Sequence, residues 1–389
     1  MTFVHAICGF LGSILLAIAA GFSGTAMLAV LFWRSRRIPP ELCPEARLPI
    51  TVLKPLCGAE PDLYRQLRSF CRQDYPDYQI IFGLRDPADA ALAVVERLIA
   101  EFPSLPIDVV VNSRQHGDNY KISNVINMLE RARHDVLLIA DSDAMVEPDY
   151  LGAVSAPLRD PKVGLVTCIY HSVPTATVWS RLGAMYINEW FVPSVLFAWL
   201  FGQRQFASGQ TLCLRRDTLQ AIGGLRAIAG HLADDFRLGE LVRGLGQRIV
   251  LSRYEVEVKQ HEPSAEALMR HELRWMRTLR VVKPRSFRAM FFSFSLPLGM
   301  VGVVLASQGS RGTIGIGWLL FAFTVAARIS LHVIHRVRGS RSILSDLWLV
   351  PARDLLLSWI WCRSFTNSRI VWRGSEFDVD ADGMMRRAA

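Results

Sequence analysis

Residues 137–143 read Leu137-Leu138-Ile139-Ala140-Asp141-Ser142-Asp143. The four apolar residues predict a buried strand, and two acids one residue apart follow it directly. Ligands of open α/β sheets bind beyond the carboxyl ends of the strands. Two carboxylates at that place suit a hard divalent cation, Mg²⁺ or Mn²⁺, which often shares its oxygen ligands with substrate phosphates. An isolated Asp-x-Asp is more often an ordinary acidic turn, so the rest of the chain has to supply the other parts of a metal–diphosphate site.

The sequence before this stretch alternates between strand and helix patterns. Apolar runs predict strands at residues 50–53, 78–84, 107–111 and 136–140, and the stretches between them predict helices at residues 62–73, 88–100 and 120–133. Such alternation implies a mostly parallel sheet that is covered by helices on both faces. Asp86 and Asp141 each come just past a predicted strand, so we expect both at the same edge of the sheet.

Three further elements follow the acidic stretch and a predicted strand at residues 163–170. Residues 179–201 are aromatic and apolar but include charged side chains, which suits either a membrane surface or a protein core. Asp234 and Asp235 open a predicted helix, and we expect Asp234 to be its N-cap. Residues 266–282 predict a helix with a cationic, Trp-bearing face that could contact phosphates or lipid headgroups.

The N-terminal sequence predicts a membrane anchor. The chain has 389 residues, of which 51% are hydrophobic, and its mean hydropathy is positive. Residues 4–33 form an apolar run that is longer than a signal-peptide core, and a basic cluster at residues 34–37 follows it. We therefore expect an uncleaved transmembrane helix with its N-terminus outside. The prolines in residues 38–40 end the helix and begin a linker.

Hydrophobicity dominates again after residue 290. Residues 290–307, 312–334 and 347–365 are three candidate membrane segments. The last one carries Arg353 and Asp354, which should face protein or a cavity because exposure of charge to lipid is costly. With the N-terminal helix, four spans would place the arginine-containing tail opposite the catalytic domain, against the positive-inside rule. Either one segment is re-entrant or interfacial, or the predicted number of spans is wrong.

Composition excludes several classes of protein. The net charge is +9, but the basic residues lie beside apolar stretches, and the sequence contains no nucleic-acid-binding motif. We therefore expect no nucleic-acid partner. The seven cysteines are scattered without a C-x-x-C pair, which argues against a zinc site or a disulfide framework and favours a reducing compartment.

The acids gather at three predicted strand or helix ends, namely Asp86, the pair Asp141 and Asp143, and the pair Asp234 and Asp235. A fourth element, the run His271-x-x-Arg274-Trp275, follows them. A nucleotide-sugar glycosyltransferase needs such a set. One carboxylate positions the nucleoside, one or two hold a metal at the departing diphosphate, and one takes the proton of the acceptor hydroxyl. A cation near the diphosphate stabilises its growing charge.

Together these motifs resemble the membrane-bound family-2 glycosyltransferases, which have a GT-A fold, and more closely the ceramide glucosyltransferase branch, family 21. The matching runs are Val52-Leu53-Lys54-Pro55-Leu56-Cys57-Gly58, Gln73-Asp74-Tyr75-Pro76, Asn119-x-Lys121-x-x-Asn124, Ala140-Asp141-Ser142-Asp143, Val163-Gly164-Leu165-Val166, Ala233-Asp234-Asp235-Phe236 and His271-Glu272-Leu273-Arg274-Trp275. The resemblance covers residues 48–283 and continues through Arg353-Asp354 and residues 371–374. The wording of residues 53–61 and 270–275 is most similar to the bacterial hopanoid-associated glycosyltransferases, which transfer N-acetylglucosamine from its UDP form to bacteriohopanetetrol.

The resemblance implies a donor site built from the first part of the chain. Asp86 would contact the uridine end of a UDP-sugar, with Lys54 and Pro55 nearby. Lys121 and Asn124 would line the donor pocket.

The resemblance also implies the catalytic roles. Asp141 and Asp143 would bind the diphosphate through Mg²⁺ or Mn²⁺, and Asp235 would be the general base. Arg274 and Trp275 would close over the diphosphate and the acceptor.

One position departs from the family pattern. Asp234, His271 and Trp275 are expected on the acceptor side, but family members usually have Gln or Arg where this chain has His271. A neutral histidine would hold a phosphate more weakly, and Arg270 beside it could compensate.

The sequence therefore predicts an α/β, GT-A (Rossmann-like) catalytic domain over residues 38–283, between an N-terminal anchor at 1–37 and a C-terminal membrane region at 284–389. The expected activity is inverting, metal-dependent transfer from a UDP-sugar to a membrane lipid at a bacterial inner membrane, with the catalytic domain in the cytoplasm. The expected substrates are UDP-N-acetylglucosamine and a hopanoid, with UDP-glucose and ceramide as the alternative. A membrane scaffold is the non-enzymatic alternative, and too few spans are predicted for the channel of a polysaccharide synthase.

Overall fold

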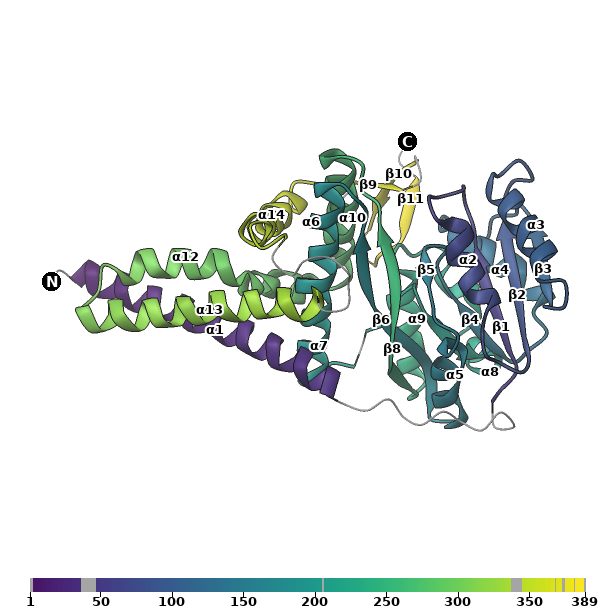
Figure 1. Cartoon of the computed structure of the whole chain (residues 1–389), viewed down its shortest axis with the longest axis horizontal. Helices are drawn as coiled ribbons and strands as arrows, with labels where there is room; N and C mark the ends of the chain where they lie inside the picture. Colours follow the sequence, from purple (N-terminus) through teal and green to yellow (C-terminus); the bar gives the residue numbers. More distant parts are fainter. Residues whose placement is uncertain are drawn as a thin grey trace. The chain divides into compact units, whose positions relative to one another are not determined.

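The structure is a computed structural model that describes residues 3–35, 47–204, 206–336, 345–367, 369–372, 375–380 and 382–387. The linker predicted at residues 38–40 and the Arg373-Gly374 part of the last matching run lie outside these residues. The chain forms two compact units (Figure 1). The sheet unit comprises residues 38–171, 203–259 and 375–389, and the helical unit comprises residues 1–37, 172–202 and 260–374.

Two segments of the predicted catalytic domain, which includes interface helices, lie in the helical unit, namely residues 172–202 and 260–283. The reason is their apolar side chains, since Leu182 and Leu268 are buried in one cluster with Leu296 from the C-terminal region.

An eight-stranded sheet is the core of the sheet unit. In sheet order its strands are β3 (Ile107–Val111), β2 (Tyr78–Leu84), β1 (Ile50–Pro55), β4 (Val136–Ile139), β7 (Leu212–Arg215), β6 (Val163–Pro174), β8 (Arg248–Gln260) and β5 (Ala144–Met145). The first four strands are parallel, but β7 is antiparallel to both β4 and β6, and β5 is antiparallel to β8. The expectation of a mostly parallel sheet is therefore wrong for the second half. Strand–helix alternation stops after β4, and antiparallel strands need no crossover helix.

Helices cover both faces of this sheet, as the alternation predicts. Successive strand residues point to opposite faces, and accordingly Val52 and Leu138 belong to one core cluster while Leu53 and Leu137 belong to another. The first cluster includes side chains of α2 (Leu63–Cys71), α3 (Ala91–Glu101) and α5 (Tyr150–Ser155). The second includes side chains of α4 (Tyr120–Met128), α8 (Arg216–Ala221) and α9 (Asp234–Gly244).

The strand register places the predicted site residues at one edge. Leu53 of β1 pairs with Ile139 of β4, and Pro55 pairs with Gly83 of β2. The three parallel strands therefore end together, and Asp86 and Asp141 follow at the same edge, as predicted.

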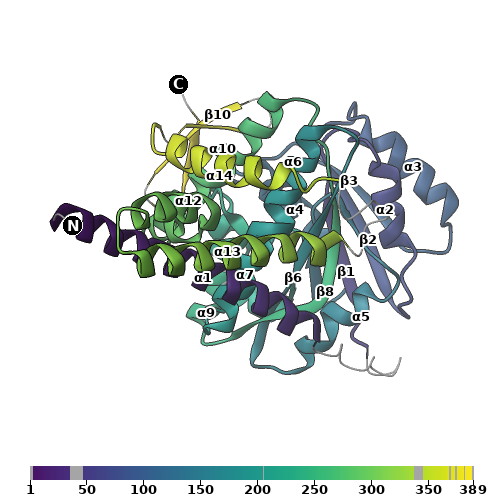
Figure 2. The same cartoon turned by 60° about the vertical axis from the view of Figure 1, so that its left-hand side comes forward.

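The helical unit is built around α1 (Phe3–Ser35), which runs beside α12 (Ser295–Ala306) and α13 (Arg311–Arg336), as Figures 1 and 2 both show. Glycines allow this close packing. A Cβ atom on Gly12 would lie 2.3 Å from the backbone nitrogen of Ala306, and one on Gly302 would lie 2.7 Å from a side-chain carbon of Leu16. Small residues that let backbones approach are typical of helices packed within membranes.

The membrane-span prediction is only partly met in the described residues. Two helices, Phe3–Ser35 and Arg311–Ile334, are long and apolar enough to cross a membrane. A third span is formed if the bent pair Pro284–Ser293 and Ser295–Ala306 counts as one. Four spans are not found, because α14 (Leu349–Ser364) has 16 residues and contains Arg353 and Asp354.

The rest of the helical unit carries the other predicted elements. The segment 179–201 folds as α6 (Val178–Tyr186), a π-helical turn (Ile187–Phe191) and α7 (Val192–Leu200), and about half of its residues are buried while only the last two are exposed. The cationic segment forms α10 (Ala265–Val282), followed by α11 (Pro284–Ala289). The described part of the tail contributes β9 (Arg369–Trp372) to this unit, whereas β10 (Ser375–Val379) and β11 (Met385–Arg387) belong to the sheet unit.

Candidate active site

A lysine joins two of the acidic motifs. The Nζ atom of Lys121 lies 2.7 Å from Oδ1 of Asp141 and 3.3 Å from Oδ2 of Asp234. Asp141 follows β4, whereas Asp234 is the first residue of α9, so only the folded sheet brings them together. The lysine itself is held by the first turn of α4, whose N-cap Asn119 accepts a hydrogen bond from the backbone N–H of Ile122 and donates one to Asp234.

The loop before β7 holds the other two acids. The backbone N–H of Gly209 donates to Oδ2 of Asp235 over 3.0 Å, and the backbone N–H of Phe236 donates to its Oδ1 over 2.7 Å. The side-chain amide of Gln210 donates to Oδ1 of Asp143 over 3.2 Å. A Cβ atom at residue 209 would lie 2.8 Å from both Oδ2 of Asp141 and the Lys121 ammonium. Gly209 therefore packs against the ion pair itself, which explains why a residue without a side chain fits there.

These contacts define one group, the carboxylate cluster, consisting of Asp141, Asp143, Asp234 and Asp235. The side chain of Lys121 is 16% exposed, and those of Asp141 and Asp234 are 30% and 10% exposed. The group is thus largely shielded but still accessible, as expected for residues that meet a soluble substrate.

A second lysine supports the Asp-x-Asp loop from the inside. Lys54 is fully buried in β1, and its ammonium donates to the backbone carbonyl oxygen of Asp141. The same ammonium lies 3.8 Å from the centre of the Phe70 ring. Burial lowers the pKa of Lys54 to about 7, although Asp143 and Asp141 oppose this shift. Lys54 therefore contacts the main chain of the loop that carries Asp141 and Asp143.

Burial, and next to it the neighbouring negative charge, raises the pKa of two carboxyl groups in the cluster. Burial raises the pKa of Asp143 to about 6, and Asp141 adds to the rise. Burial also raises the pKa of Asp235 to about 6, with Asp234 as the second cause. Burial would lower the pKa of Lys121, but the neighbouring Asp141 and Asp234 outweigh it, so this pKa is raised.

The charges of the cluster fit a divalent cation. With all groups ionised, four carboxylates and the two lysines leave an excess of two negative charges. Carboxylate oxygens are the ligands that Mg²⁺ and Mn²⁺ prefer. Within the described part of the chain no group of three or more His, Cys, Asp or Glu forms a ready metal site. A cation bound at Asp141 and Asp143 would thus need further oxygens, such as those of a diphosphate.

Three predicted donor residues lie outside the cluster. The exposed Asp86 accepts a hydrogen bond from the backbone N–H of Ala88 over 2.8 Å, and no ion pair or hydrogen bond among the described residues joins it to the cluster. Asn124 is buried and donates to the carbonyl oxygen of Gly83 over 2.8 Å, so it fixes β2. Pro55 is the buried last residue of β1.

The expected N-cap role of Asp234 is wrong. The helix α9 begins at Asp234 itself, and its N-cap residue is Ala233, which makes no side-chain hydrogen bond. The carboxylate of Asp234 contacts Lys121 and Asn119 instead. Pairing with a lysine thus takes the place of capping.

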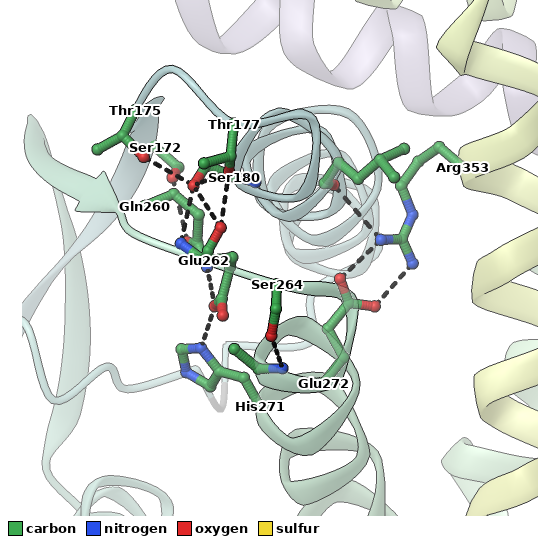
Figure 3. A network of polar contacts seen from close by, with 12 residues as sticks. Ser172, Thr175, Thr177, Ser180, Gln260, Glu262, Ser264, His271, Glu272 and Arg353 are labelled. Atoms are coloured by element: carbon green, nitrogen blue, oxygen red, sulfur yellow. Dashed lines mark hydrogen bonds and ion pairs between the residues drawn. The ribbon is translucent and has the colours of Figure 1, made fainter.

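The remaining predicted residues lie on α10, in the helical unit. His271 contacts a buried glutamate, with Nδ1 2.7 Å from Oε1 of Glu262 (Figure 3). Glu262 also accepts a hydrogen bond from Gln260 over 2.7 Å, and its backbone N–H donates to Ser180 over 2.7 Å. Arg270 does not share this network, because it is exposed and pairs with Glu266 one helical turn away.

An ion pair between Glu272 of α10 and Arg353 of α14 fixes another side of α10. Arg353 and Asp354 are both buried, as their membrane-segment context predicted. The guanidinium of Arg353 makes two hydrogen bonds to Glu272, over 2.6 and 2.7 Å (Figure 3). Glu272 is the residue after His271, so this pair joins the motif helix to α14.

The motif tryptophan is part of an aromatic stack. The ring of Trp275 lies 5.5 Å from that of Tyr186 at an interplanar angle of 17°, and Tyr186 stacks in turn on Trp190. His271 contacts Trp275 with ring centroids 4.0 Å apart. Arg274, next to Trp275, is half-buried. The stack fixes the orientation of Trp275 within the helical unit.

Sequence reasoning missed several residues of the two sites. The sequence analysis assigns no role to Gly209, Gln210 or Glu262. Asn119 belonged to a matching run but was not assigned to the acids. A Ser-Gly-Gln-Thr run directly before an apolar strand was the available signal for the loop.

Comparison with known proteins agrees with this geometry. The family described as Glycosyl transferase family 21 matches residues 14–385. Ceramide glucosyltransferase 1 of Caenorhabditis elegans is 22% identical over 382 residues, covering 92% of this chain and 78% of that protein. Ceramide glucosyltransferase 3 of the same organism is 19% identical, covering 92% of this chain and 79% of that protein.

Similarity to a solved structure concerns the fold. A mannosyltransferase from Pyrobaculum calidifontis, in complex with GDP-Man and Mn²⁺, superposes with a TM-score of 0.52 and 16% identity. The match covers 92% of this chain and 98% of that one. The predicted GT-A fold with apolar helices at both ends is thereby confirmed.

Proposed function

Because this chain belongs to glycosyltransferase family 21, we propose that it transfers a sugar from a UDP-sugar to a hydroxyl group of a membrane lipid. The observation that carries this proposal is the lysine-bridged carboxylate cluster. It joins the Asp-x-Asp acids after β4 to the acids of α9, so diphosphate binding and proton removal share one site. The family assignment also favours an enzyme over the membrane scaffold considered from the sequence.

In this proposal the cluster divides into a donor part and a catalytic part. Asp141 and Asp143 would hold Mg²⁺ or Mn²⁺, which would neutralise charge on the departing diphosphate. Lys121 balances the charge of Asp141, and Lys54 fixes the main chain of the loop that carries it.

Asp235 is the proposed general base. Its two carboxylate oxygens are aimed by the N–H groups of Gly209 and Phe236. A carboxyl pKa of about 6 makes it a stronger base than an ordinary aspartate, which favours removal of a proton from the attacking hydroxyl. Attack from the face opposite UDP inverts the anomeric centre, so an α-linked donor gives a β-glycoside.

The pH dependence of transfer tests this base. Asp235 accepts a proton only as the carboxylate, so kcat/KM is expected to rise about tenfold between about pH 5 and pH 7, with a midpoint near its pKa of about 6. An unshifted aspartate, with a pKa of about 3.9, would give a nearly flat profile over that range. The measurement is initial-rate UDP release at saturating Mn²⁺, and a flat profile would contradict the assignment.

Two observations support the proposed substrates, namely the residues of two motifs and the names of similar proteins. The runs at residues 53–61 and 270–275 favour UDP-N-acetylglucosamine and a hopanoid such as bacteriohopanetetrol. The similarity to proteins named ceramide glucosyltransferase supports the alternative of UDP-glucose and ceramide.

Product analysis by mass spectrometry decides between the two pairs. Purified protein in detergent receives each UDP-sugar with each lipid, with and without EDTA. An EDTA-sensitive hexosaminyl-hopanoid confirms the first pair, whereas glucosylceramide keeps the site and changes the substrates. If every combination fails while a UDP-sugar still binds, the proposed lipid acceptors are wrong.

We further propose that the chain crosses a bacterial inner membrane three times. Its active site would lie in the cytoplasm, at the inner face of this membrane. The start of α1 lies against the turn between α12 and α13, since a Cβ on Gly9 would be 2.8 Å from Gly309. The other end of α1 lies beside the end of α13, where Arg34 donates to the carbonyl oxygen of Ile334. Basic residues favour the cytoplasmic side, so the turn at residues 307–310 would face outward.

Cysteine labelling tests this topology. In a Cys8→Ser background, Gln308→Cys is expected to react with a membrane-impermeant maleimide in intact cells, because Gln308 is exposed at that turn. Arg288→Cys, at the exposed end of α11, is the matched control and should react only after the cells are opened. The reverse pattern would overturn the orientation.

A further inference from the structure

The helical unit contains a second buried charged cluster that the proposed reaction does not use. Arg328 of α13 donates to Glu189 over 2.7 Å and to both carboxylate oxygens of Asp354, over 2.9 and 3.0 Å. All three residues are at most 8% exposed. Charged groups inside a membrane segment are costly, so their presence points to a function.

The backbone is unusual at the same place. Glu189 lies in the π-helical turn between α6 and α7, and π-helical turns are frequent at functional sites. His332, one turn after Arg328, lies with Nδ1 2.7 Å from the other oxygen of Glu189 and is fully buried. Two helices and the turn therefore converge on one glutamate.

A small pocket opens beside this cluster. Its polar lining comprises the charged residues Glu189, Arg328 and Asp354, the serines Ser23, Ser293 and Ser295, and Trp190, and its remaining walls are apolar and aromatic. The free space holds a group of about the size of one or two water molecules. The pocket lies between α1 and α13, the two helices able to span a membrane.

One lining group lacks a protein partner. The hydroxyl of Ser23 is buried, with 2% of the residue exposed, and makes no hydrogen bond within the described structure. Serines on helices commonly bond to their own backbone one turn earlier, as Ser13 does with the carbonyl of Gly9. A buried hydroxyl left unpaired is destabilising, so a ligand group or water is expected to bond with it.

We propose that this pocket binds a hydroxyl group of a neutral membrane lipid, and that this lipid is the acceptor of the transfer reaction. The second part rests on the proposed function. The pocket would hold one hydroxyl group of the lipid, because its free space is too small for more.

Hydrogen-bonding capacity selects this class of ligand. The carboxylates of Glu189 and Asp354 only accept hydrogen bonds, and Arg328 and His332 already contact them, so a ligand group here has to donate a hydrogen bond to their remaining lone pairs, which an ionised phosphate or carboxylate cannot do. A hydroxyl can donate to a carboxylate oxygen and accept from Ser23 at the same time. A whole sugar or phosphate headgroup exceeds the free space.

Photo-crosslinking of the full-length protein tests the proposal. The protein, in phosphatidylcholine nanodiscs, receives a long-chain 1,2-diol that carries a diazirine near its polar end. Two matched probes carry the same diazirine, namely the di-O-methyl ether of the diol and the corresponding fatty acid. Peptides containing residues 20–27 or 187–193 are expected to be labelled at least fivefold more by the diol than by either matched probe.

Variants connect the labelling to the pocket. Ser23→Val, which fills the space and removes the hydroxyl, is expected to lower labelling by the diol at least fivefold and to raise KM for the lipid acceptor without changing KM for the UDP-sugar. Leu331→Phe fills the pocket from α13 and should do the same. Thr25→Val is the control on α1, since its hydroxyl bonds to its own helix at Gly21.

The outcomes separate the two proposals. Equal labelling by the diol and its di-O-methyl ether, or undiminished labelling of both filled variants, would overturn the pocket. Labelling needs no UDP-sugar, so hydroxyl-dependent labelling that unlabelled acceptor lipids fail to compete away would refute only the identification with the acceptor. Absence of transfer with every acceptor would refute the proposed function without affecting the labelling result.

Discussion

Asp235→Asn is expected to lower kcat by about 10²- to 10⁴-fold, the usual contribution of a general base. Asparagine has nearly the same shape, and its single amide oxygen can accept one of the two hydrogen bonds that Gly209 and Phe236 donate, but its NH2 group cannot accept the other and the side chain cannot take a proton. UDP-sugar affinity, measured by isothermal titration in the presence of Mn²⁺, should change little. Initial rates of UDP release give kcat.

The neighbouring acid is the matched control for this variant. Asp234→Asn removes one charge from Lys121 but leaves Asp235 in place. We expect it to weaken donor binding more than it lowers kcat. If Asp235→Asn transferred sugar at the wild-type rate while Asp234→Asn did not, the base would have to be reassigned to Asp234.

Arg353→Met is expected to reduce the free energy of unfolding by about 3–5 kcal/mol, the typical cost of leaving one partner of a buried ion pair uncompensated. Both partners are almost completely buried, with the side chain of Arg353 1% exposed and that of Glu272 0% exposed. Burial already raises the pKa of Glu272, and loss of the guanidinium would raise it further. Reversible denaturation in mixed detergent micelles measures the loss.

Two further variants identify the cause. Arg363→Met removes an exposed arginine from the same helix and should cost less than about 1 kcal/mol. The double variant Glu272→Met/Arg353→Met removes both charges and should recover much of the loss, because a buried pair is often replaceable by apolar residues of similar volume. A double variant as unstable as Arg353→Met would show that packing, not unpaired charge, is responsible.

The parallel half of the sheet was predictable because its information is local. Strands β2 and β3 begin and end where their apolar runs do, and β1 and β4 differ by two residues or fewer. The antiparallel half depends on β7, which pairs with β4 across more than seventy residues of intervening chain. No local pattern specifies such a partner, since strand propensity is indifferent to the direction of pairing.

In the candidate active site, too, local features could be predicted from the sequence and long-range contacts could not. The positions of Asp141 and Asp235 relative to their strand and helix could be anticipated, but the ion pairs of Lys121 are a property of the folded sheet. The contacts of Gly209 are made through its main chain, which leaves no side-chain pattern in the sequence. His271 is the opposite case. Its departure from the family motif is visible in the sequence, but its contact with Glu262 is not, because Glu262 belongs to no recognised motif.

The glycine contact between α1 and α12 has a consequence for biosynthesis. Gly12 and Gly302 are about 290 residues apart in the chain, and ribosomes add roughly 5–20 residues per second. For roughly 15–60 s, therefore, α1 waits in the membrane before its own chain supplies the surface that covers its small-residue face. During that interval another nascent copy can pair with the same face. The helical unit can therefore assemble only late in synthesis, long after α1 has been made.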